Sequence, residues 1–269
     1  NYVFSGYQVN KQPFTLQADG SVNYQGDKGQ RALQIASNVV VELNQSGHEV
    51  FLNSNNAIGD FEVAYTPGAN DGGLFVTNAD VTNRGTHNDA NAPYTFTFTS
   101  PTDLTVTDNT ATTVFNTTTY SPGQNISFNG MTVTVDGSPL PGDQFVLSPE
   151  NKASIFDSIG DALKWLESPA STAFSTQHQV DYDHILNQLN SDFNHLTTKR
   201  SDAGLRLNQA NRQKDFHLDY QLSLEQARSQ IEDLDYAQAV IEFNENTRAL
   251  QASQQAFGKV KDITLFNYV

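Results

Sequence analysis

Ile126-Ser-Phe-Asn-Gly-Met-Thr-Val-Thr-Val135 is the stretch that decides the fold of the first half of the chain. Two runs of alternating apolar and polar residues flank Asn129-Gly130. This dipeptide favours a tight hairpin turn, because both turn residues of type I′ need a positive φ. The same alternation recurs at 95–99 and 104–107, which is typical of half-buried strands. These patterns predict an antiparallel β-sandwich-like domain over residues 1–148.

Other segments of the first half carry weaker patterns. Residues 39–43 and 49–52 contain several Val, Leu and Phe residues and flank Ser46-Gly47, which predicts another strand pair around a turn. Residues 66–91 are rich in Gly, Asn and Asp, and this composition predicts a loop or an inserted surface segment.

The first helix is predicted to begin at Ser148-Pro149-Glu150. A serine can cap free N–H groups, proline is tolerated at the first helical position, and glutamate suits the positive end of the helix dipole. Apolar residues at 155, 159, 163 and 166 then recur at helical spacing. We therefore expect an amphipathic helix that ends near Ser168-Pro169.

Glycine and proline divide the chain into two parts. All but three of the 17 glycines, and all of the nine prolines except Pro169, lie in residues 1–150. Both residue types disfavour helix interiors, so the second part should be helical. We expect a helical domain over 149–232 and a C-terminal helix over 233–269, which makes the fold α+β with long helices of the coiled-coil type.

The helical part carries two apolar seams with heptad spacing. The first comprises Leu186, Leu189, Phe193, Leu196, Arg200, Ala203, Leu207 and Ala210, and the second Val240, Phe243, Thr247, Leu250, Gln254 and Phe257. A long helix with such a stripe needs partner helices, and one short helix is too little to cover it. The residues that we expect to form an assembly interface are Leu189, Phe193, Leu196, Leu207, Val240, Phe243, Leu250, Phe257, Leu265 and Phe266.

Composition excludes several classes of function. The net charge of -15 disfavours binding to nucleic acid, because a strongly acidic surface repels phosphates. The chain has no cysteine, so disulfides, thiolate metal sites and cysteine nucleophiles are excluded. No apolar run reaches the roughly 18 residues that a membrane span needs. We expect no membrane insertion.

No catalytic or cofactor motif stands out. Asp181 and Asp183 point about 200° apart on a helix and cannot share an ion, so a solvated face is the expected role of this cluster. His178, His184 and His195 lack the spacing of a metal pair. Glu232, Asp233 and Asp235 fit a charged surface better than an acid–base pair, and Asn70-Asp71-Gly72-Gly73 matches only one half-copy of a calcium repeat. We expect no enzyme activity, no metal and no cofactor.

Specific motifs nevertheless carry a resemblance to bacterial flagellar axial proteins, and within them to the hook-associated protein 3 family. The C-terminal segments 227–237, 250–257 and 263–269 are similar to those of flagellin and its relatives. The segments that resemble the hook-associated protein 3 family more closely are 2–7, 11–14, 23–27, 47–51, 139–145, 154–156 and 204–208.

The resemblance implies a structural subunit that connects hook to filament. N- and C-terminal helices of the family pair in a tube wall, with a β domain projecting outward, and a further N-terminal helical segment would precede Asn1 in the natural protein. The implied partners are copies of the chain in a tubular ring, hook-associated protein 1, flagellin and an export chaperone. The implied location is the extracellular flagellum, reached through the flagellar type III apparatus.

Two alternatives remain open. Filament flagellin shares the C-terminal motifs, and an extracellular carbohydrate-binding module or enzyme would use the β domain as its site. A sugar groove presents clustered Trp or Tyr, whereas the single tryptophan, Trp165, lies between Leu163 and Leu166 on a predicted helix, where core packing is expected.

The tail from Asp235 to Val269 has the weaker seam. Thr247 and Gln254 interrupt it, and its alanines bury little apolar area. Because ordering a residue costs roughly 1–2 kcal/mol, we expect the tail to be frayed in the free subunit and to become a packed helix on assembly.

Overall fold

The computed structural model describes residues 1–66, 68–168 and 175–262, except for the side chains of 233–235 and 262. The chain forms two compact units, Asn1–Leu207 and Asn208–Val269. Of the elements in the described residues, the first unit contains the strands, the shorter helices and the beginning of the long helix α3 (Thr176–Asp262). The described part of the second unit is the rest of α3.

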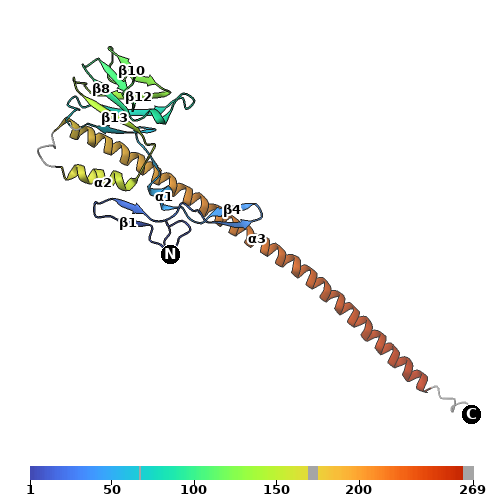
Figure 1. The fold of residues 1–269 in the computed structure, drawn as a ribbon. Helices are drawn as coiled ribbons and strands as arrows, with labels where there is room; N and C mark the ends of the chain where they lie inside the picture. The colour runs from blue at the N-terminus through green and yellow to red at the C-terminus, as the bar shows by residue number, and fades with distance from the viewer. Residues whose placement is uncertain (67, 169–174, 263–269) are drawn as a thin grey trace, which may run out of the picture. The chain divides into compact units, whose positions relative to one another are not determined.

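Two antiparallel sheets form the β-sandwich, as the sequence predicts (Figure 1). The five-stranded sheet has the order β10-β9-β8-β13-β6 and the three-stranded sheet the order β11-β12-β7. Their bounds are β6 (Phe61–Tyr65), β7 (Phe75–Val81), β8 (Tyr94–Phe98), β9 (Leu104–Thr107), β10 (Thr113–Thr117), β11 (Asn125–Phe128), β12 (Met131–Asp136) and β13 (Gln144–Pro149).

The hairpin between β11 and β12 confirms the prediction from Asn129-Gly130. Phe128 pairs directly with Met131, so these two residues alone form the turn. Asn129 has φ 45° and Gly130 has φ 74°, the positive values that a type I′ turn requires.

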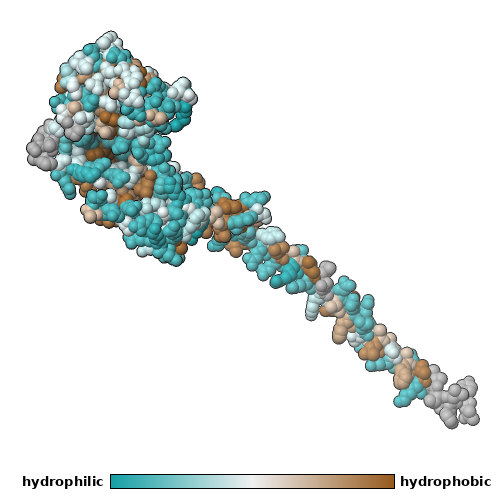
Figure 2. Space-filling model, in the orientation of Figure 1, coloured by the Kyte–Doolittle hydropathy of each residue, from teal (hydrophilic) through white to brown (hydrophobic). Residues whose placement is uncertain are grey.

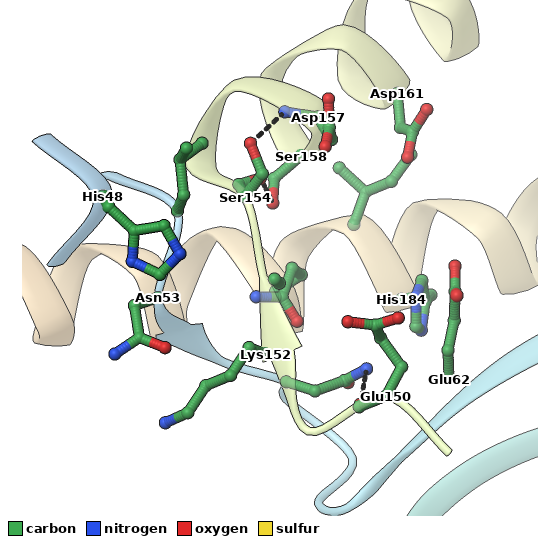
Figure 3. Close-up of a pocket in the computed structure, with 15 residues that line it drawn as sticks. His48, Asn53, Glu62, Glu150, Lys152, Ser154, Asp157, Ser158, Asp161 and His184 are labelled. Carbon is green, nitrogen blue, oxygen red and sulfur yellow. Dashed lines mark hydrogen bonds between the residues drawn. The ribbon is translucent and has the colours of Figure 1, made fainter. Parts of the chain in front are cut away.

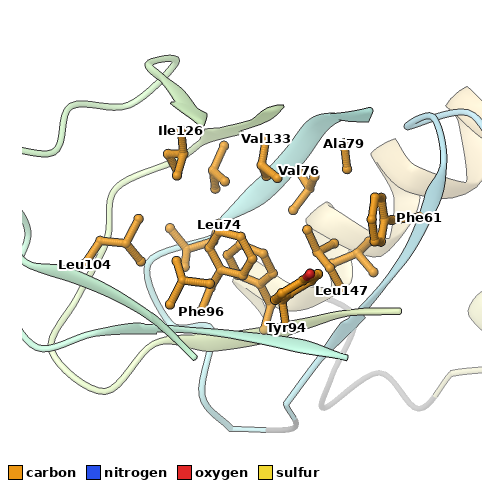
Figure 4. Close-up of a cluster of buried hydrophobic side chains, with 14 of the residues drawn as sticks. Phe61, Leu74, Val76, Ala79, Tyr94, Phe96, Leu104, Ile126, Val133 and Leu147 are labelled. Carbon is orange, nitrogen blue, oxygen red and sulfur yellow. The ribbon is translucent and has the colours of Figure 1, made fainter. Parts of the chain in front are cut away.

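The apolar faces of the two sheets meet in the hydrophobic core (Figure 4). Alternate residues of β8, β9, β12 and β13 point inward. Phe96 on β8 stacks on Phe145 on β13 with 4.6 Å between ring centroids. Val133 on β12 faces them from the other sheet and is fully buried. Each large side chain buried in this way contributes roughly 1.5–3 kcal/mol to folding.

The strand pair predicted at 39–43 and 49–52 is wrong in its second half. Strand β4 (Val39–Glu42) pairs with β3 (Ala32–Ala36), which precedes it. Residues Gly47–Phe51 form the short helix α1 instead. The Ser46 hydroxyl accepts a hydrogen bond from the Glu49 N–H at 3.3 Å, and this cap starts the helix where the side chains alone suggest a strand.

The segment 66–91 is also more ordered than predicted. It contains the core strand β7 and a 3-10 helix, η1 (Asp89–Asn91). The pairing of β7 with β12 is irregular at Thr134/Val135, so Val76 and Ala79 both face the core although they are three residues apart. This bulge breaks the alternation that would otherwise have marked the strand.

Helix α2 (Ile155–Leu166) begins six residues after the predicted start at Pro149. Strand β13 continues to Pro149, which pairs with Phe61 at the outer edge of the sheet. Strand β14 (Lys152–Ala153) then pairs with β5 (Ser54–Asn55). The Ser154 hydroxyl, not that of Ser148, caps the helix by accepting from the Asp157 N–H.

The remaining strands lie beside these helices. Strands β1 (Phe14–Leu16) and β2 (Val22–Tyr24) form a hairpin. Phe14 packs on Phe51 of α1 and on Phe156 of α2, with centroid distances of 5.5 and 5.1 Å. This aromatic cluster ties the beginning of the chain to the two short helices.

Candidate functional site

Helix α2 exposes most of its apolar stripe. Ile155 is buried, but Ile159, Leu163 and Leu166 are 46, 53 and 69% exposed. The helix is therefore amphipathic, as predicted, and its apolar side covers little of the first unit. These side chains are available to another helix or subunit.

Trp165 fixes α2 against the first turns of α3. Its Nε1–H donates to the His178 carbonyl oxygen at 2.9 Å, and its ring stacks on the His178 imidazole with 4.3 Å between centroids. Tyr182 packs against it at 5.1 Å. Within the first unit the two helices run side by side in opposite directions (Figure 1). Trp165 therefore packs at the contact between α2 and α3, in agreement with the packing role expected from the sequence.

A polar face of α3 docks this helix on the β part of the first unit. Gln188 is 7% exposed, and its Oε1 accepts from the Ala57 N–H at 2.8 Å. Its Nε2 donates to the Asn55 carbonyl at 3.2 Å and to Asp192 Oδ1 at 3.0 Å. One side chain therefore joins the helix to a segment more than a hundred residues away.

Further contacts continue along the same face. His195 Nε2 lies 2.9 Å from the Glu49 carbonyl oxygen, and Lys199 Nζ lies 3.4 Å from Glu49 Oε2. Arg206 forms an ion pair with Glu42. Gln188, Asp192, His195 and Lys199 recur at spacings of three and four, so a polar helical stripe was present in the sequence and could have identified this face.

The predicted heptad seam lies on the adjacent face of α3, because Leu189, Phe193 and Leu196 each follow a residue of the polar stripe by one position, about 100° around the helix. Leu189 and Leu196 are half-buried, whereas Phe193 and Leu207 are 67 and 63% exposed. The structure therefore directs the polar stripe inward and leaves most of the apolar seam to solvent.

In the second unit the seam is exposed as well. Phe243, Leu250 and Phe257 are 60 to 73% exposed, and Val240 is 41% exposed. Figure 2 shows apolar side chains recurring along this helix between hydrophilic ones. The other two predicted interface residues, Leu265 and Phe266, lie outside the described residues.

A pocket of about 520 Å³ lies between α1, α2 and α3 in the first unit. Figure 3 shows Glu62 and His184 together at one end of it and His48 at the other. Burial raises the pKa of the Glu62 carboxyl, and the nearby Glu150 and Asp161 carboxylates raise it further.

Two histidines of this pocket have pKa values below the ordinary one. Burial lowers the pKa of His184, which Asp181 and Asp161 oppose only in part. Burial and the charge of Lys28 lower the pKa of His48. The solvated face expected for the 181–184 cluster is thus wrong for His184, which lines the pocket.

Other parts of the suspected metal sites have structural partners. Asp181 accepts a hydrogen bond from Gln177. In the segment that matches half a calcium repeat, the backbone N–H groups of Asp71 and Gly72 donate to the carboxylate of the buried Asp143. Within residues 1–66, 68–168 and 175–262, no three His, Cys, Asp or Glu side chains converge as a metal site. In the same residues, no helix has the length and apolar character that crossing a membrane demands.

Comparisons place this geometry among flagellar proteins. Residues 186–269 match the family model of the bacterial flagellin C-terminal helical region. No curated protein matches the chain at a significant level. The crystal structure of the flagellar junction protein FlgL from Legionella pneumophila is 29% identical with a TM-score of 0.67, over 81% of this chain and 70% of that one.

Two further structures show the same fold. Flagellar hook-associated protein 3 from Legionella pneumophila is 28% identical with a TM-score of 0.70, over 87% of this chain and 73% of that one. FlgL from Xanthomonas campestris is 20% identical with a TM-score of 0.68, over 85% of this chain and 73% of that one. These likenesses include the β-sandwich as well as the helical region that flagellin shares.

Proposed function

We propose that this chain is a structural subunit of the bacterial flagellum, a flagellin-like axial protein of the hook-associated protein 3 type that forms the junction between hook and filament. The observation that carries this proposal is the extent of the likeness. Flagellin shares the matched helical region 186–269, whereas the likeness to junction proteins covers 81 to 87% of the chain. The β-sandwich therefore favours a junction subunit over a filament flagellin.

The exposed seam gives this function a mechanism. Phe193 and Leu207 in the first unit, and Phe243 and Phe257 in the second, are each more than 60% exposed. Each contributes roughly 1.5–3 kcal/mol when it is buried against a neighbour. Copies of the chain would pack these residues against one another in the wall of a tubular ring.

The finer organisation follows from the same reading. Residues 1–148 would form the outer domain, 149–232 the wall helices and 233–269 the innermost helix. Hook-associated protein 1 would lie on the hook side, flagellin on the filament side, and an export chaperone would hold the chain before passage through the type III apparatus. The subunit would act by packing alone, without catalysis, metal or cofactor.

Deleting the gene in the source organism tests the junction role. We expect cells with complete hooks but no attached filaments, and with flagellin released into the medium. The natural gene supplied in trans should restore filaments, and the same gene with Phe193→Asp and Phe243→Asp should not. Filaments of normal number and attachment in the deletion strain would contradict the proposal.

A further inference from the structure

One side of the β-sandwich is open in both of its layers. Strand β10 is the last strand of the five-stranded sheet, and β11 is the last strand of the three-stranded sheet. Phe115 on β10 and Phe128 on β11 are 6.2 Å apart between ring centroids, so the two edges lie next to each other. The opposite edges, β6 and β7, are connected by the bridge between Gly59 and Ala79.

The two edge strands carry no charge. From Asn109 to Val135, the range that contains both of them, the chain has no Asp, Glu, Lys, Arg or His, and Asp108 and Asp136 flank this range. In the whole chain 17% of residues are charged and the net charge is -15. Exposed edge strands are normally protected by charged side chains, particularly lysine, because a free edge pairs readily with other strands.

The side chains of the edge are suited to strand pairing. Thr113 and Asn116 on β10, and Asn125 and Ser127 on β11, are exposed and small or uncharged. Val114 and Phe115 pack against the core of the sandwich. A bulge between Thr113 and Phe115 shortens the regular part of β10, whereas β11 keeps an unbroken register over its full length. The edge therefore offers two short segments of backbone for hydrogen bonding.

We propose that this edge, formed by β10 and β11, is a docking surface for the same edge of a second copy of the chain. A two-fold axis perpendicular to the sheets would pair β10 with β10 and β11 with β11, both antiparallel, and would extend both layers at once. Two copies that each carry a charge of -15 repel one another, and approach through the segment 109–135 keeps like charges off the paired strands. This contact does not depend on the place of the subunit in the flagellum.

Asn116 allows the contact to be tested without disturbing the core. It is exposed on β10, and its Nδ2 donates to Thr105 Oγ1 at 3.2 Å. In sedimentation experiments over a concentration series, the full chain should form dimers. Asn116→Lys and Asn116→Asp should each lower the association constant about tenfold, because two like charges would face each other across the axis. The controls Ser37→Lys and Ser37→Asp change charge equally at the exposed β3–β4 turn and should have no effect.

The two signs of charge separate edge pairing from general repulsion. If long-range repulsion controlled association, lysine would strengthen it and aspartate would weaken it at either position. Hydrogen exchange adds a direct readout, since amides of 113–117 and 125–128 should gain protection as concentration rises. Asn125→Lys on β11 repeats the test should the Asn116 variants fold poorly. A chain that stays monomeric, or a dimer that neither Asn116 variant nor Asn125→Lys weakens, would overturn the proposal. Phe193→Asp disrupts the apolar seam of α3 and leaves the strand edge unchanged. A dimer that persists in this variant therefore forms through the edge and not through the seam.

Discussion

Replacing Gln188 by alanine should detach α3 from the β part of the first unit. The substitution removes three hydrogen bonds and leaves the Ala57 N–H, the Asn55 carbonyl and Asp192 with fewer partners in a buried setting. Each such bond contributes about 0.5–1.5 kcal/mol net, and a buried group left unpaired costs more. We expect the free energy of unfolding to fall by about 3 kcal/mol, after the small gain from the helix propensity of alanine.

The fluorescence of Trp165 reports this change, because its ring stacks on His178 of the docked helix. Urea unfolding of the wild type, Gln188→Ala and the control Asn187→Ala should be compared by this signal. Asn187 is exposed on the same helix, so the control should stay within about 0.5 kcal/mol of the wild type. Equal unfolding midpoints for Gln188→Ala and Asn187→Ala would refute the docking argument.

Gln188→Glu separates the hydrogen bonds from side-chain volume. A glutamate can still accept from the Ala57 N–H, but its carboxylate cannot donate to Asn55 and would repel Asp192. We expect it to be at least as destabilising as alanine at neutral pH and to recover stability on acidification. Stability that does not rise with protonation would mean that contacts other than these bonds hold the helix.

Three further predictions concern other parts of the chain. Gly130→Ala should destabilise the protein by about 1–3 kcal/mol in thermal unfolding, because φ is 74° there and a Cβ would lie 2.4 Å from a backbone carbonyl oxygen. The control Gly160→Ala places its Cβ in open space on α2 and should be neutral or stabilising. His48 and His184 have pKa values below the ordinary 6.5, so the fold favours their neutral forms. Their contribution to the free energy of unfolding should be complete above pH 6.5 and should decrease as the pH drops below it. His184→Gln should make this decrease smaller. The pKa of Glu62 is raised, so the fold disfavours its ionised form. This group alone would therefore make stability rise as the pH falls toward its ordinary pKa of 4.5. Amides of 240–258 should exchange rapidly in the free subunit, since nearly all side chains there are exposed, and strong protection without a partner would contradict this.

The sequence predicts the fold best where a pattern is local and unbroken. The alternation at 95–99, the Asn129-Gly130 turn and the helix after residue 175 all appear in the structure. The errors occur where one signal fits two structures. Ser148-Pro149 has the form of a helix start but ends the inner strand β13, at a point where β13 still pairs with β6 and no longer with β8. The missing N–H of Pro149 therefore interrupts no pairing with β8.

The missed helix α1 had a recognisable signal. Ser46-Gly-His-Glu49 has the spacing of a capping box, and the β-prone side chains that follow it outweighed that signal in the strand prediction. The pocket and the docking face were harder to foresee. They depend on contacts such as Gln188 with Asn55, which join distant segments and leave no local periodicity around Asn55.

The division of α3 between a polar face that docks and an apolar face that stays free has a consequence for assembly. Hydrogen bonds are directional and need little area, so Gln188 and His195 can hold the helix in one orientation while Phe193 remains exposed. Over 186–207 the helix is thereby ordered before any partner arrives, and burial of the seam carries little entropic cost.

The tail has no such docking contacts in the described residues 236–261, where ordering each residue costs roughly 1–2 kcal/mol. A seam that forms first at 186–207 would supply a neighbour on which this tail can pack. Assembly should therefore proceed from the docked part of α3 toward its C-terminal end.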